Sequence, residues 1–298
     1  MCPCTTRSKT RSPGWSRPSP TARRGRSWLP TACCVEAVVT VTGPPRQITT
    51  ADGRAAFRKT SPHAPPLFFA REVAGLRALA GAGARVPEVL DAPEDQITLA
   101  WIERGEHRTA LTEERFGQEL AALHRSTGSR YGSVDGEPTG YLGDCPVDLT
   151  PSDTWEEAWI ERRLIPLARQ AADAGAIDPG TAALVEQLSA EHLGPVEAPT
   201  LVHGDLWAGN RIIDRLGHEW LIDPCAQYGH REVDLAMMQL FGGFSGRALS
   251  AYAEAYPLSV GWTERIALYQ SVPLLVHALL FGGGYGVQAG AALREAVR

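Results

Sequence analysis

The chain has 298 residues, 44% of them hydrophobic, and a formal net charge of −5. This length suffices for two lobes around one cleft, and no apolar run approaches the roughly 20 residues of a membrane helix. Residues 1–34 carry seven basic side chains and no acid, so the remaining chain has a formal charge of −12. An acidic body argues against nucleic-acid binding, because phosphate contacts need clustered cations.

Residues 1–34 are rich in Ser, Arg, Pro and Thr and show no periodicity. We expect a disordered basic extension there, or upstream sequence read as protein through a wrong start site. Four of the six cysteines lie in this segment, and Cys145 and Cys225 are isolated. Because neither a disulfide framework nor a zinc spacing is indicated, the sequence favours a reducing cytoplasm.

Residues 35–102 are predicted to form a small β-rich, nucleotide-binding lobe. The β-branched segment 35–41 indicates a strand, and residues 47–59 indicate a hairpin that turns at Asp52-Gly53. Helical periodicity runs from Phe68 to about Leu79, and residues 97–102 have strand character.

Residues 103–298 are predicted to form a larger, mainly helical lobe. The predicted helices cover residues 113–126, 154–173, 179–191, 232–241, 247–256 and 263–281. Asp178 before Pro179 is typical of a helix start, and residues 242–243 and 282–284 of helix ends rather than phosphate loops. The sequence thus predicts an α+β protein with two lobes.

The segment from Leu201 to Asn210, followed by Asp223, carries the clearest chemical signal. Asp205 precedes Asn210 by five residues, the interval that protein kinases place between their catalytic Asp and a metal-binding Asn. Residues 211–222 read as strand, turn and strand, which would carry Asp223 back beside Asp205. We therefore expect Asp205 to accept a proton from a substrate hydroxyl and Asn210 and Asp223 to hold Mg²⁺ on ATP.

Two further residues fit the same plan upstream. Lys59 ends a predicted strand, and Glu72 lies thirteen residues later on the next helix. A Lys that neutralises ATP phosphates needs an anion to hold it, which a helix Glu supplies. His203 and Asp234 are interpreted as structural supports of the catalytic loop. Core packing is the better interpretation of His277 and of the pair Trp155 and Trp159.

The chain resembles the fructosamine kinase (ketosamine-3-kinase) family over roughly residues 55–290. The motifs are His-Gly-Asp-Leu-Trp-Ala-Gly-Asn at 203–210, Ile-Asp-Pro at 222–224, and Gly-His-Arg-Glu-Val-Asp-Leu-Ala-Met at 229–237. The first motif is shared with aminoglycoside phosphotransferases and choline kinases, and the last narrows the resemblance to fructosamine kinases. This resemblance implies a protein-kinase-like fold and ATP-dependent phosphorylation of a ketosamine at O3 of its sugar. The phosphorylated adduct would then fall apart and free the amine.

The resemblance also implies roles for residues that spacing does not assign. The backbone of Ala100 and Ile102 would face adenine as the hinge between lobes, and Trp207 would lie near the acceptor. Tyr228 and His230 are further candidates for substrate contact. Gly43 is the single glycine in 42–46, where the family has a glycine-rich phosphate loop, and Pro44 and Pro45 have no N–H to donate.

Three functions stay open on the sequence alone. The favoured one is a ketosamine kinase, for which the acidic body suggests a small or cationic acceptor such as a glycated lysine. The second is a phosphotransferase for an aminoglycoside or another small molecule. The third, prompted by the degenerate glycine loop, is a nucleotide-binding module with little turnover. The oligomeric state is not predicted.

Overall fold

The computed structural model describes residues 46–105 and 108–298. The predicted extension 1–34, the predicted strand 35–41 and Gly43 lie outside these residues. Every described residue belongs to one compact unit, Val38–Arg298. The lobe boundary near residue 102 therefore stays a prediction.

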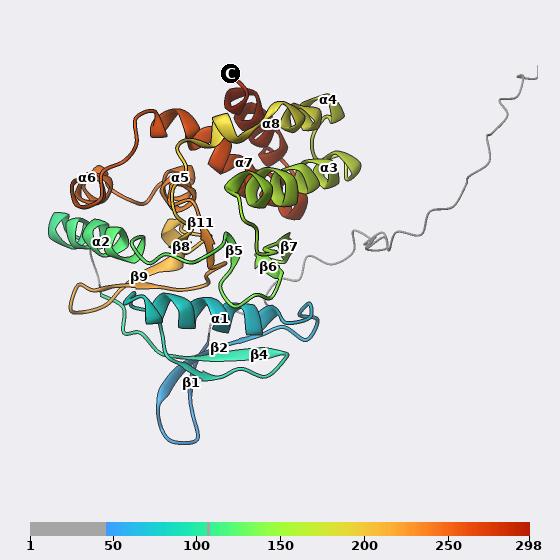
Figure 1. Cartoon of the computed structure of the whole chain (residues 1–298). Helices are drawn as coiled ribbons and strands as arrows, with labels where there is room; N and C mark the ends of the chain where they lie inside the picture. The colour runs from blue at the N-terminus through green and yellow to red at the C-terminus, as the bar shows by residue number, and fades with distance from the viewer. Residues whose placement is uncertain (1–45, 106–107) are drawn as a thin grey trace, which may run out of the picture. The chain divides into compact units, whose positions relative to one another are not determined.

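The N-terminal part of the described chain is a four-stranded antiparallel sheet covered by one helix (Figure 1). Its elements are β1 (Arg46–Thr49), β2 (Ala55–Thr60), α1 (Phe68–Gly81), β3 (Val89–Asp91) and β4 (Gln96–Ala100), with strand order β1-β2-β4-β3. The predicted hairpin is present, and Gly53 supplies its positive φ of +85°. The apolar side of α1, with Phe69 and Leu76, packs on Ile97 and Leu99 of β4.

The rest of the chain is mainly helical. Its helices are α2 (Ala110–Leu123), η1 (Glu157–Leu164), α3 (Ile165–Asp173), α4 (Pro179–Ala182), η2 (Ala183–Gln187), η3 (Ala190–Leu193), η4 (Ala208–Asn210), α5 (Glu232–Leu240), α6 (Gly246–Ala255), η5 (Trp262–Arg265), α7 (Ile266–Phe281) and α8 (Tyr285–Ala296). The two large cores here are helix-built, one around α7 and the other around α2 and α6. None of the helices in the described ranges has the length and apolarity of a membrane span.

Short strands connect these helices. They are β5 (Gly132–Ser133), β6 (Thr139–Leu142), β7 (Cys145–Asp148), β8 (Thr200–Val202), β9 (Arg211–Ile213), β10 (Glu219–Leu221) and β11 (Gln227–Gly229). β11 lies between β5 and β8, β9 pairs with β10 as predicted, and β6 pairs with β7. The polar motifs of the sequence begin directly after β8 and β10 and at the end of β11.

Some helices differ from their prediction. The helix predicted over 154–173 begins as the π-helix η1 and continues as α3. The helix predicted over 179–191 starts at Asp178, whose side chain accepts a hydrogen bond from the Thr181 N–H, but breaks at Leu188, whose backbone is extended. The next short turn starts at Ser189, whose backbone N–H donates to His192 Nδ1 at 3.2 Å. Helix α8 and the β6–β7 hairpin were not predicted.

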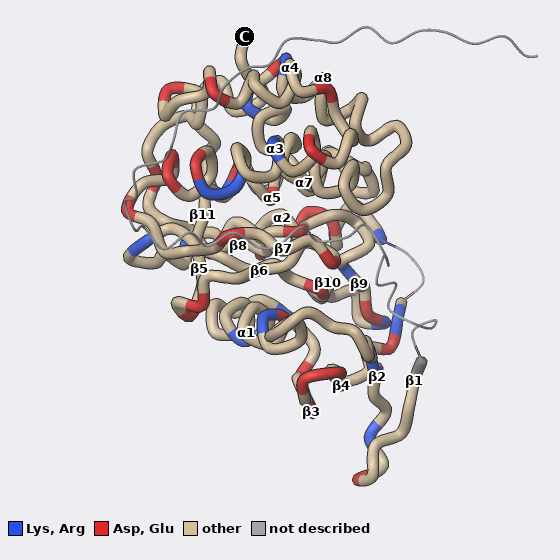
Figure 2. Tube along the Cα trace, turned by 90° about the vertical axis from the view of Figure 1, so that its right-hand side faces the viewer, with Lys and Arg blue, Asp and Glu red and all other residues tan. Residues whose placement is uncertain are grey.

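Helix α1 lies between the sheet and the strands of the helical part in both views (Figures 1 and 2). Its start is held by β6, because the Tyr141 hydroxyl donates to the Pro66 carbonyl at 2.9 Å. Arg71 makes two hydrogen bonds to Asp135, at 2.7 and 2.8 Å. A Cβ added at Gly75 would lie 3.0 Å from Pro224 Cγ, so this helix packs directly against the segment that follows Asp223. Helix α1 is thus fixed beside the predicted metal-binding segment.

Candidate active site

One cavity of about 410 Å³ is lined by the predicted catalytic residues from both parts of the chain. Asp205 and Asn210 reach it from the segment after β8, Asp223 from the segment after β10, and Lys59 and Glu72 from β2 and α1. The β9–β10 hairpin closes as predicted, since the Ile222 N–H donates to the Asn210 carbonyl at 3.0 Å. Residues far apart in the sequence therefore converge on one space.

Asp205 lies half-buried at this cavity and is oriented by Asn210. The Asn210 Nδ2 group donates to the Asp205 backbone carbonyl and to its Oδ2, both at 2.9 Å. Burial raises the pKa of Asp205 to about 7, although the hydrogen bond from Asn210 opposes the rise. A carboxylate with a pKa near neutrality is suited to accept a proton, and its Oδ1 is not engaged by Asn210.

Lys59 is held between two carboxylates. Its Nζ lies 2.8 Å from Glu72 Oε1 and contacts Asp223 Oδ1. Burial lowers the pKa of Lys59, but the charges of Glu72 and Asp223 outweigh it and raise the pKa above its ordinary value. Lys59 is therefore a fixed cation at the cavity and carries its charge throughout the physiological range.

Asp223 adopts an unusual backbone conformation. Its φ is +55°, one of two positive φ values among non-glycine residues of the described chain, and its side chain is 41% exposed. Such a conformation costs about 1–3 kcal/mol and is often found at functional positions. The surrounding packing maintains it, because Pro224 lies against α1 at Gly75. The result is a carboxylate directed to the cavity while the chain turns back into the core.

The loop that carries Asp205 is anchored from below by Asp234. The backbone N–H groups of His203 and Gly204 donate to the two Asp234 oxygens, at 2.7 and 2.9 Å. Asp234 is fully buried, and hydrogen bonds led by that from His124 lower its pKa against the effect of burial. A paired, ionised carboxylate in the core thus positions the backbone of the catalytic segment.

His203 supports the same loop through its ring. Its Nε2–H donates to the Ile222 carbonyl at 2.9 Å, and its Nδ1 accepts from the Asp205 N–H at 3.2 Å. These partners require the neutral ring, and burial lowers the pKa of His203 accordingly. His203 therefore links the segment before Asp223 to the backbone of Asp205.

The lining of the cavity also contains residues that the sequence did not assign to the site. It includes Tyr141 and Asp144 of the β6–β7 hairpin and His277 and Phe281 of α7. His277 has the hydrogen-bond partner predicted for a core histidine, since its Nδ1–H donates to the Pro273 carbonyl at 2.7 Å. Its predicted place in the core is wrong, because it is half-buried and lines the cavity. Trp207, the predicted acceptor residue, also lines the cavity and is 40% exposed.

The other two substrate candidates do not line this cavity. Tyr228 belongs to β11, the central strand of its sheet, and its ring packs on Gly128, where an added Cβ would lie 2.7 Å from the ring. His230 is 2% exposed and stacks on Tyr269 with ring centroids 5.6 Å apart. Both predictions are corrected, because Tyr228 is partly buried against the core and His230, which follows β11, is buried.

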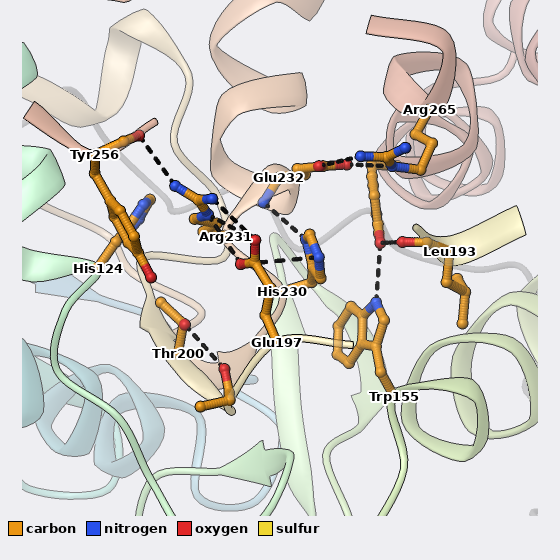
Figure 3. Close-up of polar contacts among 12 residues, drawn as sticks. His124, Trp155, Leu193, Glu197, Thr200, His230, Arg231, Glu232, Tyr256 and Arg265 are labelled. Atoms are coloured by element: carbon orange, nitrogen blue, oxygen red, sulfur yellow. Dashed lines mark hydrogen bonds and ion pairs between the residues drawn. The ribbon is translucent and has the colours of Figure 1, made fainter. Parts of the chain in front are cut away.

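His230 belongs instead to what we call the buried ion-pair network: Glu197, His230, Arg231, Glu232 and Arg265 (Figure 3). Arg231 makes three hydrogen bonds to Glu197, at 2.9 to 3.2 Å, and two more to the carbonyls of Tyr256 and Pro257. Arg265 makes two hydrogen bonds to Glu232, at 2.6 and 2.8 Å. Most of the Gly-His-Arg-Glu motif thus serves the scaffold.

Trp155 and Trp159 are buried, as predicted, and stack on each other with centroids 5.2 Å apart. Ala100 and Ile102 line a second hollow, of about 690 Å³, rather than the cavity of Lys59. Strand β2 connects the two places: Ala56, the partner of Ala100, precedes Lys59 by three residues. That is about 10 Å of strand.

Comparisons with known proteins agree with this geometry. The family model described as fructosamine kinase matches residues 36–298. A protein from Thermus thermophilus that is assigned as a ketoamine kinase is 40% identical over 227 residues, which are 76% of this chain and 82% of that protein. A rice (Oryza sativa subsp. japonica) protein named as a chloroplastic protein-ribulosamine 3-kinase is 32% identical over 249 residues, 78% of this chain and 70% of that protein.

A solved structure is similar as well. The crystal structure of a candidate fructosamine-3-kinase from Thermobifida fusca has a TM-score of 0.78 and 38% sequence identity. The likeness covers 85% of this chain and 88% of that chain.

Proposed function

Because the chain belongs to the fructosamine kinase family, we propose that it transfers the γ-phosphate of ATP to O3 of the sugar in a ketosamine. The predicted α+β fold with the two lobes of protein-kinase-like phosphotransferases is confirmed. The observation that carries the proposal is the convergence of Asp205, Asn210, Asp223 and Lys59 on one cavity. Catalysis would rest on positioning and electrostatics rather than on a covalent intermediate.

Asp205 is the proposed catalytic residue. Its pKa of about 7 lets it take the proton of the attacking sugar hydroxyl near neutral pH. The hydrogen bond from Asn210 fixes Oδ2, which leaves Oδ1 for the substrate. Asp234 and His203 act on the reaction only by holding this loop.

Asn210 and Asp223 are the proposed ligands of Mg²⁺. The Asn210 amide nitrogen is engaged by Asp205, so its oxygen is the group left to face the cavity, and the Asp223 carboxylate is partly exposed there. Among the described residues, no group of three or more His, Cys, Asp or Glu side chains is arranged to hold a metal ion by itself. Two oxygen ligands suit an ion that is also bound by phosphates and water. When bound, Mg²⁺ would neutralise charge on the transferred phosphoryl group.

The nucleotide would lie along β2. Lys59, which is oriented by Glu72, would bind the phosphates, and the backbone at Ala100 and Ile102 would contact adenine. The separation along the strand suits a ligand whose base and phosphates are bound at different points. Gly43, which is not among the described residues, is also proposed to contact the phosphates.

The phosphorylated adduct would fall apart and free the amine, so the reaction reverses a glycation. The freed amine would belong to a glycated protein or small molecule. We place the enzyme in a reducing cytoplasm, because Cys145 and Cys225 are free buried thiols.

An acceptor comparison tests the proposal. The purified chain is incubated with Mg·ATP and either Nε-fructosyl-lysine or kanamycin, and products are detected by mass spectrometry. We expect a monophosphorylated product from fructosyl-lysine and none from kanamycin. Phosphorylation of kanamycin alone would favour the aminoglycoside alternative. Stabilisation by Mg·ATP in a thermal-shift assay without phosphorylation of fructosyl-lysine would favour the binding module.

A further inference from the structure

The β6–β7 hairpin contributes one carboxylate to the lining of the cavity. Asp144 follows Gly143 in the two-residue turn between β6 and β7 and is half-buried. The turn is pressed toward α7, since a Cβ added at Gly143 would lie 3.2 Å from Leu280. Asp144 therefore shares the cavity with Asp205 but comes from a different segment of the chain.

Asp144 differs from the other charged residues of this cavity in having no partner within the described ranges 46–105 and 108–298. Lys59 is bound by two carboxylates, and Arg71 by Asp135. Among the residues that the structure describes, none makes a hydrogen bond or ion pair with the Asp144 carboxylate, and burial alone raises its pKa. A half-buried carboxylate without a donor is suited to a cation brought by the ligand.

A row of four aromatic rings lies at this cavity, and three of them, Trp207, His277 and Phe281, line it. Trp207 contacts Phe241 with centroids 6.2 Å apart, and Phe241 contacts His277 at 5.0 Å. His277 contacts Phe281 at 5.4 Å, and Phe281 is 60% exposed. We call these four residues the aromatic row. Exposed rings of this kind bind alkyl chains and the faces of cations.

We propose that Asp144 binds the protonated amine nitrogen of the ketosamine, and that the substituent on this nitrogen leaves the cavity over the aromatic row. The inference rests on the proposed function and adds the residue that selects a cationic acceptor. It requires no further chemistry, because the nitrogen is bound and not transformed.

The chemistry of the acceptor fits this arrangement. An aliphatic secondary amine carries a positive charge at neutral pH, and in a ketosamine it is bonded to the first carbon of the sugar. With the sugar hydroxyl at Asp205, this nitrogen must lie within a few bonds of it, still inside the cavity. The lining of the cavity has two cations, Lys59 and Arg71, and four acids, so its formal charge favours a cationic acceptor.

The test compares two acceptors that differ in this one atom. The first is Nε-fructosyl-lysine with its α-amino and carboxyl groups blocked, and the second replaces the amine nitrogen with an ether oxygen. We expect Asp144→Asn to lower kcat/KM for the amine about tenfold or more, mainly through KM. The same substitution should change kcat/KM for the ether less than about twofold. Asp144→Glu, which keeps the charge, should restore much of the preference for the amine.

Asp173→Asn is the matched control, because Asp173 is an exposed aspartate at the end of α3 and does not line the cavity. Asp173→Asn should leave kcat/KM unchanged for both acceptors. Equal losses of kcat/KM for both acceptors in Asp144→Asn, or no loss for the amine, would overturn the inference. Turnover of fructosyl-lysine by the unmodified chain would still support the proposed function in that case. No turnover of either acceptor by the unmodified chain would overturn both.

Discussion

The cavity and the buried ion-pair network are both rich in charge, yet they use it in opposite ways. In the network, Arg231 is 3% exposed and makes five hydrogen bonds, to Glu197 and to two backbone carbonyls. In the cavity, Asp205 is held at one oxygen only, and Asp144 at none among the described residues. Arg231 is thus satisfied within the scaffold, whereas Asp205 and Asp144 keep carboxylate oxygens that are available to a substrate.

This comparison divides two polar motifs that look alike in the sequence. The His-Gly-Asp segment ends at the cavity, and the Gly-His-Arg-Glu segment ends in the core. Substitutions in the two regions should therefore have different effects. Those in the cavity should remove turnover and leave stability unchanged, and those in the network should lower stability and leave turnover per folded molecule unchanged.

The largest effect is expected for Asp205→Asn. Loss of the base should lower kcat by about 10²- to 10⁴-fold. The midpoint of thermal unfolding at about pH 8 should not fall, since the ionised Asp205 is penalised by burial when its pKa is raised to about 7. Kinetics and thermal melts of both forms measure this. A variant with full turnover, or one that melts well below the unmodified chain, would break the comparison.

The opposite behaviour is expected for Arg231→Leu. Removing one partner of a buried pair leaves Glu197 uncompensated, which should lower the free energy of unfolding by about 3–5 kcal/mol. Urea denaturation measures the loss, and the folded fraction should keep most of its turnover per molecule. Arg169→Leu is the matched control, because the Arg169–Glu186 pair is 68% and 62% exposed and should contribute less than about 1 kcal/mol.

A smaller effect is expected for Glu72→Gln. Lys59 would keep its contact with Asp223 but lose the ion pair that orients it from α1. Misplacing this cation should lower kcat/KM for ATP by about 10²-fold or less. Steady-state kinetics with varied ATP would show it, with the exposed Glu186→Gln as control. A loss confined to the acceptor KM would place Glu72 outside the nucleotide site.

The smallest effect is the pH dependence. Because the pKa of Asp205 in the folded chain is about 7, above its ordinary 3.8, Asp205 is protonated and inactive at lower pH. The value of kcat/KM should rise about tenfold per pH unit toward pH 7 and level off above it. A profile that is flat between about pH 6 and pH 8 would contradict the assignment of the base.

Much of the fold and the catalytic end of the cavity follow from local patterns. Strand β2, helix α1 and the β9–β10 hairpin were predicted, and with them the meeting of Lys59, Glu72 and Asp223. These elements have clear periodicity or a clear turn, so spacing along the chain translates into position in space.

The sequence did not predict the β6–β7 hairpin, helix α8 or the cavity position of His277, each for a physical reason. The β6–β7 hairpin is short and contains Pro146, which cannot donate to a sheet, although Gly143-Asp144 is a typical tight turn. Helix α8 buries small residues such as Ala289 and Gly290, so its hydrophobic periodicity is weak. His277 lies on an apolar helix, and only the arrangement of α7 against the hairpin shows that it faces a cavity.

A crystal structure with Mg²⁺, a non-hydrolysable ATP analogue and Nε-fructosyl-lysine tests the central claim most directly. We predict Mg²⁺ bound by Asn210 and Asp223, and a sugar hydroxyl within about 3 Å of the Asp205 carboxylate and in line with the terminal phosphate. A sugar bound with its hydroxyls directed away from Asp205, or metal and phosphates bound outside this cavity, would contradict the account.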